Sequence, residues 1–378
     1  MARIKALFRT QPVLLIAATI TLITFLIMPP TTALFYALDV KTLASLFAMM
    51  GVIAALRSIH VFETAASWML KHFHTTRRLI MALVFLTFGF SMFIANDMAL
   101  LTFLPFTFLV LKDLHQPRLI LYSVVLQNIG ANLGGMLTPF GNPQNLYLYS
   151  YFNIPTDRFL QIMILPFLLS IGLLFLACLI VKPDPIHVPE TGTMMVPKGK
   201  LLFYLALFLV TLLMVFRVIP YVWGTLGVTL GLLLFRPQSL KEVDYGLLLT
   251  FIFFFLITGS LARSNEVHAF LSLLVERSVY WYGILSCQLL SNVPTAVLFS
   301  HFTPLAQAPA LLLAVNLGGM GTLIASLASL ISFQFFSRNF NRYALRYFII
   351  YTFVNVTFLL VLSLSMRWLL EAIGWVLF

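Results

Sequence analysis

Three long stretches of this chain carry no charged side chain, and they limit what it can fold into. Residues 119–156, 278–337 and 347–366 contain no Asp, Glu, Lys or Arg, and the second stretch is the longest. Because one helical membrane crossing needs about 20 residues, that stretch must cross a bilayer, or enter it and return, more than once. With 61% hydrophobic and 9% charged residues, the sequence predicts an all-α polytopic membrane protein with about 10–11 spans.

The net charge of +11 does not indicate a nucleic-acid-binding protein, because basic residues lie at the ends of apolar segments, as Arg78 and Arg338 do. This distribution is typical of membrane proteins, whose cytoplasmic loops are rich in Lys and Arg. It predicts the lipid bilayer as a partner, and no nucleic acid. The basic N-terminus, with Arg3, Lys5 and Arg9, is expected in the cytoplasm and the protein in the plasma (inner) membrane.

The apolar segments predict membrane spans near residues 11–28, 35–56, 79–95, 119–137, 159–181, 201–217, 219–235, 245–262, 279–290 and 347–370. Only Lys182–Lys200, with four prolines and mixed charge, has the composition of a linker. It divides the chain into a predicted first repeat, residues 1–181, and a predicted second repeat, residues 201–378.

The pentapeptide Asn-Leu-Gly-Gly-Met occurs twice, at Asn132–Met136 and Asn316–Met320, and the two copies are separated by close to half the length of the chain. Small residues recur in helix-packing sequence, so coincidence is one explanation. Duplication is favoured, because the same offset aligns a whole polar tail: Thr138 with Thr322, Asn142 with Ser326 and Asn145 with Ser329. A duplicated membrane chain with matched polar breaks predicts two inverted repeats, as in secondary transporters.

Each half contains an apolar segment that is interrupted by an Asn. Asp97, which follows Asn96, is the only charged residue within residues 79–111. The arms on either side are short for a full crossing, so this segment predicts a re-entrant hairpin with Asn96 and Asp97 at its tip. The second predicted tip surrounds Pro294 and contains Ser291, Asn292 and Thr295. Irregular backbone at this depth survives only where it is buried or lines a wet cavity, so both tips indicate a binding site.

Downstream of each hairpin a helix is predicted to break. Pro139 and Pro143, with Gly141 between them, will not continue an α-helix, and a new half-helix is expected to begin near Pro143. Its free N–H groups and positive dipole end favour an anion, and further polar atoms come from Thr138, Asn142 and Asn145. The second half offers Thr322, Ser326 and Ser329 without prolines, so its break is predicted to be milder.

These polar residues could instead make helix–helix hydrogen bonds, which contribute about 0.6–2 kcal/mol each in membranes. Asp97 is the more unusual residue, because a carboxylate at the bilayer centre costs about 2.5–3.5 kcal/mol. It is therefore expected to bind a coupling cation or proton. The alternative is a fixed ion pair with Arg57 or Arg263.

No enzyme motif is present: the sequence contains no GxSxG, HExxH, Walker or CxxC pattern. It therefore predicts no catalytic residues, no enzymatic activity and no cofactor. Cys178 and Cys287 are lone cysteines in apolar segments, which is typical of small core residues. His301 is expected to be a packed or interfacial residue.

Four segments resemble the citrate-transporter-like branch of the ion transporter superfamily, which includes divalent anion:sodium symporters, arsenite permeases and short bacterial anion permeases. They are NDMALLTFLPF (96–106), LTPFGNPQNL (137–146), LSNVPTAVLF (290–299) and NLGGMGTLIASLASLI (316–331). They occur in order and in both halves, so the resemblance spans essentially the whole chain.

The resemblance implies a scaffold domain, a mobile transport domain with two hairpins and two broken helices, and a homodimer. It places a possible Na⁺ site at Asn96, Asp97, Asn142 and Asn292. The first tip departs from the symporters, which carry Ser-Asn-Thr at both tips, because here it is Ala-Asn-Asp.

Taken together, these features predict a secondary active transporter that moves a small anion or oxyanion, di- or tricarboxylate-like, by alternating access coupled to Na⁺ or H⁺. The alternatives within transport are arsenite efflux and Na⁺/H⁺ antiport. A membrane-embedded enzyme or a structural subunit is disfavoured, because the first needs clustered acidic or His residues and the second needs no duplicated breaks.

Overall fold

The computed structural model describes residues 12–32, 34, 38–70, 73–111, 116–186 and 195–372. Within these ranges the chain is helical apart from turns, loops and one isolated bridge between Thr75 and Pro185. The predicted all-α class is therefore confirmed. The basic N-terminal residues lie outside the described ranges, and the predicted cytoplasmic N-terminus stays a prediction.

The helices in chain order are α2 (Pro12–Ile27), α4 (Val40–Arg57), α5 (Val61–Leu70), α6 (Thr76–Ile94), α7 (Asn96–Leu111), α8 (Pro117–Gly134), η2 (Gly135–Leu137), α9 (Pro143–Tyr151), α10 (Thr156–Leu179), α11 (Lys198–Val215), α12 (Tyr221–Phe235), α13 (Pro237–Lys241), α14 (Tyr245–Leu261), α15 (Asn265–Leu290), α16 (Asn292–Ser300), η3 (Leu305–Gln307), α17 (Ala308–Leu317), α18 (Leu327–Asn339), η4 (Asn341–Tyr343) and α19 (Ala344–Ala372).

Six of the described helices are long and apolar enough to cross a membrane, and a seventh crossing is possible through α14 and α15, which meet at a bend of 104°. Fewer helices reach crossing length than the predicted number of spans requires, because several predicted spans are short helices, such as the 15-residue α12. The predicted span 279–290 is the second part of α15, which is extended at Ser278 (φ −174°, ψ 101°). By length and composition, the structure supports six to seven crossings.

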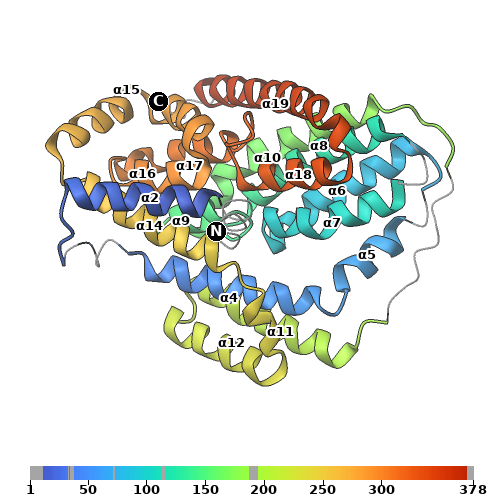
Figure 1. The fold of residues 1–378 in the computed structure, drawn as a ribbon, viewed down its shortest axis with the longest axis horizontal. Helices are drawn as coiled ribbons and strands as arrows, with labels where there is room; N and C mark the ends of the chain where they lie inside the picture. Colours follow the sequence, from blue (N-terminus) through green and yellow to red (C-terminus); the bar gives the residue numbers. More distant parts are fainter. Residues whose placement is uncertain are drawn as a thin grey trace.

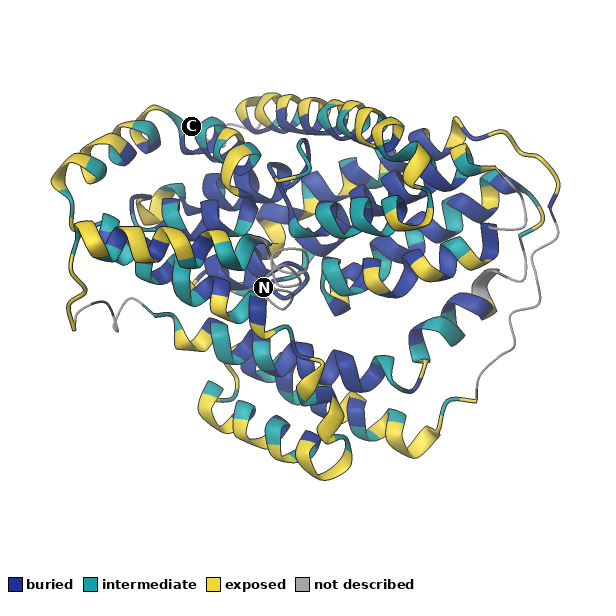
Figure 2. Cartoon of the chain, in the orientation of Figure 1, coloured by how far each residue is buried: buried dark blue, intermediate teal, exposed yellow. Residues whose placement is uncertain are grey.

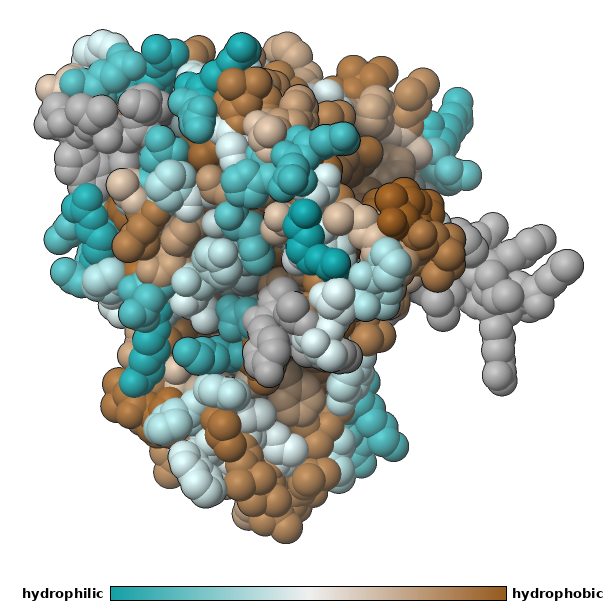
Figure 3. Space-filling view, turned by 90° about the vertical axis from the view of Figure 1, so that its left-hand side faces the viewer, coloured by the Kyte–Doolittle hydropathy of each residue, from teal (hydrophilic) through white to brown (hydrophobic). Residues whose placement is uncertain are grey.

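The helices form a buried centre, and helices with many exposed residues lie around it (Figure 1, Figure 2). The α8 span is 89% buried inside the protein, whereas the α11 span is only 28% buried. Exposed residues of the outer helices are large and apolar, among them Leu202 and Leu209 of α11 and Phe353 of α19. Such side chains are stable against lipid tails, so these helices face the bilayer. The end face drawn in Figure 3 mixes hydrophilic and hydrophobic residues, and hydrophobic residues are prominent at its lower end.

The two predicted hairpins are present, and they enter the centre from opposite ends of the molecule (Figure 1). Helices α6 and α7 pack together, as do α15 and α16. The turn between each pair is a residue with positive φ: Ala95 (φ 63°, ψ 148°) and Ser291 (φ 79°, ψ 158°). Such a backbone is unusual for residues with a Cβ and costs about 1–3 kcal/mol, so the surrounding structure must hold it in place. Both halves therefore build the same strained turn.

Both predicted helix breaks are also present. Half-helix α9 begins at Pro143, as expected, and α18 begins at the matching position of the second half, Leu327. Each half-helix packs against helices of the other half of the chain. Helix α9 packs on α16 and α17, while α18 packs on α7 and α8. The expectation of a milder second break is wrong. Residues 318–326 lie between α17 and α18, and Gly321 has a φ of 109°, which only glycine adopts readily.

The first part of the predicted linker is hydrogen-bonded to residues at and just before the start of α6. Asp184 O accepts a hydrogen bond from Thr76 N at 2.9 Å, and His74 O accepts one from Ile186 N at 3.0 Å. Residues 187–194 lie outside the described ranges, and residues 198–200 already belong to α11. The boundaries of the two repeats stay a prediction.

Candidate functional site

A cavity of about 90 Å³ lies where four half-helices begin. Its wall includes Asn96 at the start of α7, Pro143 at the start of α9, Asn292 at the start of α16, and Leu327 at the start of α18. The volume is several times the roughly 10–15 Å³ that one water requires, so the cavity can hold a small solute. The two strained hairpin turns and the two helix breaks thus meet at one place.

The electrostatics of this cavity combine positive helix ends with negative side chains. Each helix N-terminus carries a partial positive charge, which favours anions. Two carboxylates, Asp97 and Asp244, line the cavity, and none of its described lining residues is Lys, Arg or His. An anion entering here therefore meets favourable backbone dipoles and unfavourable carboxylates together.

The repeated pentapeptide places one asparagine of each half at the centre of a polar network. Asn132 Oδ1 accepts hydrogen bonds from Asn96 Nδ2 at 2.9 Å and from Ser326 Oγ at 3.0 Å. Asn316 Oδ1 accepts one from Asn142 Nδ2 at 3.2 Å. Asn132 therefore ties the first hairpin tip to the break of the second half, and Asn316 ties the break of the first half to α17.

Each hairpin tip is fastened to a helix break by a backbone hydrogen bond. Asn96 N donates to Gly141 O at 3.1 Å, and Asn292 N donates to Ala325 O at 2.9 Å. The two acceptors, Gly141 and Ala325, are separated along the chain by the same interval as the two pentapeptides. In both tips the Asn Oδ1 then accepts from the next backbone N–H at 2.9 Å. The equivalence of the two halves, inferred from sequence, thus extends to individual hydrogen bonds.

The predicted site residues fall into two groups. Five of them line the cavity: Asn96, Asp97, Ser291, Asn292 and Ser326. The others support its walls: Thr138, Gly141, Asn142, Asn145, Thr295, Thr322 and Ser329 do not line it.

The contacts of the second group explain this difference. Asn145 Nδ2 donates to Gly135 O, Met136 O and Thr138 O at 3.2–3.3 Å, and its Oδ1 accepts from Asn316 at 2.6 Å. Its side chain closes the end of α8 and η2 and has little capacity left for a ligand. Asn142, in contrast, has a buried Oδ1 with no hydrogen-bond partner.

Three more of these residues are held by nearby groups. Thr138 Oγ1 donates to Met92 O at 2.6 Å, and Tyr351 Oη donates to Ser329 Oγ at 2.6 Å. Thr322 Oγ1 donates to Gln288 O at 3.1 Å. These bonds orient the helix breaks, which is a supporting role in the wall of the site.

Sequence reasoning missed several polar residues of the site. Gln144, Asp244 and Thr250 line the cavity, and Asn132 and Asn316 form its hydrogen-bonded centre. Asp244 could have been noticed as an acidic residue directly before an apolar run, which is a helix N-cap signal. Gln144 carries no such signal, because only the fold brings it to the second hairpin.

Neither arginine that was considered as a fixed partner of Asp97 pairs with it. Arg57 donates to Leu101 O at 3.3 Å, and Arg263 donates to Pro29 O and to Thr31. The ion pairs recorded in the described ranges do not include Asp97, and its Oδ1 is buried without a hydrogen-bond partner. The ion-pair alternative is therefore not supported.

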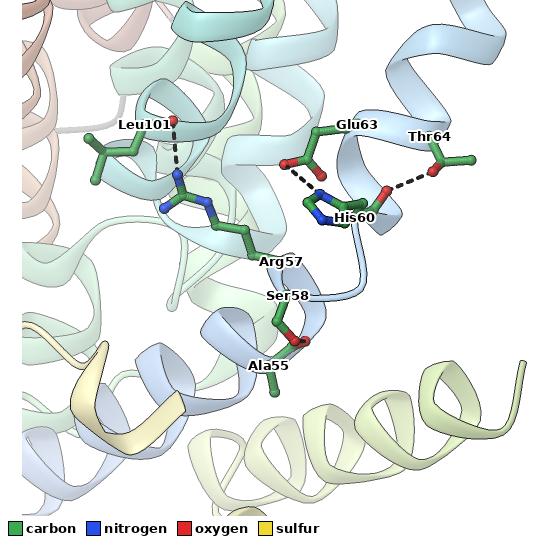
Figure 4. A network of polar contacts seen from close by, with 7 residues as sticks. All are labelled: Ala55, Arg57, Ser58, His60, Glu63, Thr64 and Leu101. Atoms are coloured by element: carbon green, nitrogen blue, oxygen red, sulfur yellow. Dashed lines mark hydrogen bonds and ion pairs between the residues drawn. The ribbon is translucent and has the colours of Figure 1, made fainter. Parts of the chain in front are cut away.

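Two further cavities lie along α4 and share lining residues with the site. A cavity of about 60 Å³ shares Asp97 and Asp244 with the site and adjoins Met50 of α4. A larger one of about 500 Å³, which we call the Arg57 vestibule, is lined by Arg57, Leu101, Asp244 and residues near them. Figure 4 shows Arg57 reaching from the end of α4 to Leu101 of α7, beside a His60–Glu63 contact.

A second vestibule lies at the other end of α4. This Lys41 vestibule, of about 320 Å³, is lined by Lys41, Ser45, Tyr149 and Arg217 among others. Lys41 and Arg57 lie near opposite ends of this one helix, roughly 24 Å apart at about 1.5 Å of rise per residue. The two vestibules are therefore on opposite sides of the apolar middle of α4.

Comparison with known proteins agrees with this geometry. The chain matches the citrate transporter family over residues 4–309. It is 33% identical over 310 residues to an uncharacterized transporter of Methanocaldococcus jannaschii, covering 81% of this chain and 83% of that one. It is also 29% identical over 307 residues to the inner membrane protein YbiR of Escherichia coli, covering 79% and 80% of the two chains. This chain is thus a membrane transporter, and it belongs to the citrate transporter family.

Proposed function

We propose that the protein is a secondary active transporter of a small anion or oxyanion, di- or tricarboxylate-like, coupled to Na⁺ or H⁺. The observation that carries this proposal is the composition of the central cavity. Four helix N-termini converge there with neutral amides and hydroxyls, and its lining carboxylates have no basic counterpart among the described lining residues.

This composition favours coupling for an electrostatic reason. Helix N-termini attract an anion, but Asp97 and Asp244 repel it, and repulsion is strong where water is scarce. An anion becomes stable in the cavity when a cation or proton neutralises carboxylate charge at the same time. Such mutual dependence of two ligands is the thermodynamic basis of symport.

The residues have distinct proposed roles. Asn96, Ser291, Asn292 and Ser326 offer the polar groups that contact the anion, and Asp97 holds the coupling cation or proton. Asn142 and Asn145, with the asparagines of the repeated pentapeptide, position the broken helices. We also propose that the amide oxygens of the two tips contact Na⁺.

Alternating access would use the two vestibules at the ends of α4. Between them, Leu46, Met49, Met50 and Ile53 of α4 line the cavity of about 60 Å³ next to the site. An apolar surface without hydrogen bonds lets a hairpin domain slide without losing polar contacts. We further propose two such protomers per assembly and a cytoplasmic N-terminus in the plasma (inner) membrane.

The alternative functions, arsenite efflux and Na⁺/H⁺ antiport, rest on the same carboxylates. A site with carboxylates and no basic lining residue among those described could carry a cation alone, with Asp97 as the exchanged site. In that case no anion would move with it.

Transport by purified protein in liposomes tests these functions. Labelled citrate, succinate, phosphate and arsenite are supplied under inward Na⁺ or H⁺ gradients, and uptake of at least one anion is expected to depend on one gradient. Cation exchange without anion uptake would favour antiport and contradict the main proposal.

Asp97→Asn is expected to abolish uptake or to make it independent of the driving gradient, because the neutral amide no longer requires a cation. Asp157→Asn is the matched control: Asp157 also lies in the first turn of a helix, α10, but it is outside the cavity. It is expected to transport like the wild type. Unchanged ion dependence in a well-folded Asp97→Asn protein would remove Asp97 from the mechanism.

A further inference from the structure

Asp244 has the widest access of any acidic residue near the site. It lines the central cavity, the adjoining cavity of about 60 Å³ and the Arg57 vestibule. Asp97 lines the first two of these. Asp97 belongs to the first hairpin and Asp244 to the start of α14, so the two carboxylates approach one space from different elements.

The helix cap at Asp244 uses only part of its carboxylate. Asp244 Oδ1 accepts a hydrogen bond from Leu247 N at 2.9 Å, and its Oδ2 accepts none in the described part of the chain. Asp39, the N-cap of α4, has nearly the same backbone (φ −79°, ψ 83° against φ −76°, ψ 82°). There both oxygens are occupied, by Thr42 N at 3.1 Å and Thr42 Oγ1 at 2.6 Å. Leucine in place of that threonine leaves one oxygen of Asp244 available to the cavity.

Gln144 supplies a second and independent sign of a missing ligand. It is 1% exposed and lines the central cavity. Its Nε2 makes one long hydrogen bond, to Asn316 Oδ1 at 3.4 Å, while its Oε1 is buried with no partner. Asp97 Oδ1 is likewise buried with no hydrogen-bond partner. Unsatisfied buried acceptors are rare in folded proteins and indicate an absent donor, water or cation.

We propose that Asp97, Asp244 and Gln144 bind Na⁺ through their side-chain oxygens, in the central cavity that the starts of α7, α9 and α14 line together. Carboxylate and carbonyl oxygens are the ligands that hard cations prefer. Two negative charges and a neutral oxygen suit the binding of a cation. None of the described lining residues of this cavity has a positive side chain. Asp244 also lines the Arg57 vestibule.

This inference deepens the coupling part of the proposed function, on which it rests, and gives it a structural consequence. A cation held by α7 and α14 together links the first hairpin to a helix outside the pair of hairpins. Releasing the cation removes that link, so Na⁺ occupancy controls whether the hairpin can separate from α14.

Thermal unfolding of the purified full-length protein in detergent tests the site without requiring transport. The midpoint is measured over a series of NaCl concentrations at constant ionic strength, with choline chloride as the balance and KCl as a parallel series. The wild type is expected to be stabilised by Na⁺ in a saturable manner and less by K⁺, because only a bound ligand shifts stability by mass action.

Asp244→Asn is expected to raise the half-saturating Na⁺ concentration by about tenfold or more, since one charged ligand is lost. Asn is as good an N-cap as Asp, so the helix start is preserved and the basal midpoint should stay close to that of the wild type. Gln144→Leu, which keeps the volume and removes the oxygen, is expected to raise the half-saturating concentration as well. Asp39→Asn is the matched control and should leave Na⁺ stabilisation unchanged.

Wild-type half-saturation in a folded Asp244→Asn protein would overturn the inference. So would stabilisation that follows pH alone with no difference between Na⁺ and choline, because that result indicates a proton site. The liposome assay decides the proposed function separately. If Na⁺ binds through Asp244 but no anion is taken up, the cation site stands and anion symport fails.

Discussion

Gly134, in the first copy of the repeated pentapeptide, allows a close contact between α8 and the first hairpin. A Cβ built on it would lie 2.1 Å from Phe88 O and 2.4 Å from Ser91 Oγ. Ordinary contact begins at 3.4 Å, so an alanine at this position would overlap both atoms. The nearer blocking atom belongs to the backbone of α6, so the helix itself must move. We predict that Gly134→Ala destabilises the protein and displaces the tip of the hairpin.

Two opposing contributions set the size of this effect. Replacing glycine by alanine inside a helix is favourable by about 1 kcal/mol. Forcing a new carbon into a packed interface costs about 1–3 kcal/mol, occasionally more, and here rigid backbone leaves no easy relaxation. The net expectation is a loss of up to about 2 kcal/mol, from the difference of these two contributions. The uptake rate is expected to fall by more than this loss of stability alone would cause, because α6 carries the turn at Ala95 that presents Asn96 to the cavity.

Gly89, in the middle of α6, is the matched control, because a Cβ there would meet no atom within 4 Å. Gly89→Ala is expected to be neutral or slightly stabilising. Thermal midpoints in detergent and uptake rates in liposomes are measured for both variants. A Gly134→Ala protein with wild-type midpoint and uptake would show that the close approach is not needed, and equal damage by Gly89→Ala would show that the effect is unspecific.

Asn145→Ala is expected to lower stability by about 2 kcal/mol or more, because it removes hydrogen bonds to three carbonyls and to Asn316. Asn142→Ala removes fewer bonds, so its thermal midpoint should fall less while transport is impaired; equal midpoints for the two variants would contradict this. Arg57→Gln is expected to raise the KM for the anion several-fold and leave the Na⁺ dependence of uptake unchanged, since Arg57 lines the vestibule and not the inner cavity. A change in Na⁺ dependence would place Arg57 in the coupling step instead.

Several features of this protein were predictable because they depend on local backbone chemistry. Proline removes a donor and restricts φ, so the start of α9 at Pro143 followed from the sequence. The spacing of the two pentapeptides predicted a second break at the aligned residues, and α18 begins at the position that matches Pro143. The second break was misjudged, because the absence of proline was given more weight than the glycines at 318, 319 and 321.

The number of full crossings was less predictable, because hydropathy reports burial and does not distinguish lipid from protein. Hairpin and half-helix segments are as apolar as true spans, and only their length in the fold separates them. Which polar residues line the site was also hard to predict from the sequence. Asn145 and Asn96 look alike in sequence, yet one is fully hydrogen-bonded inside the wall and the other lines the cavity.

By itself the sequence determined the membrane class, the two hairpin tips and the two helix breaks, because each depends on residues that are neighbours along the chain. The repeated pentapeptide and the polar residues aligned with it indicated the duplication. Only the tertiary structure decided which polar groups meet. Asn142 reaches Asn316 across 174 residues, and Ser326 reaches Asn132 across 194. Asp244 and Gln144 became site residues for the same reason: they come from α14 and α9, far apart along the chain, and the packing that brings both to one cavity is set by the whole buried core.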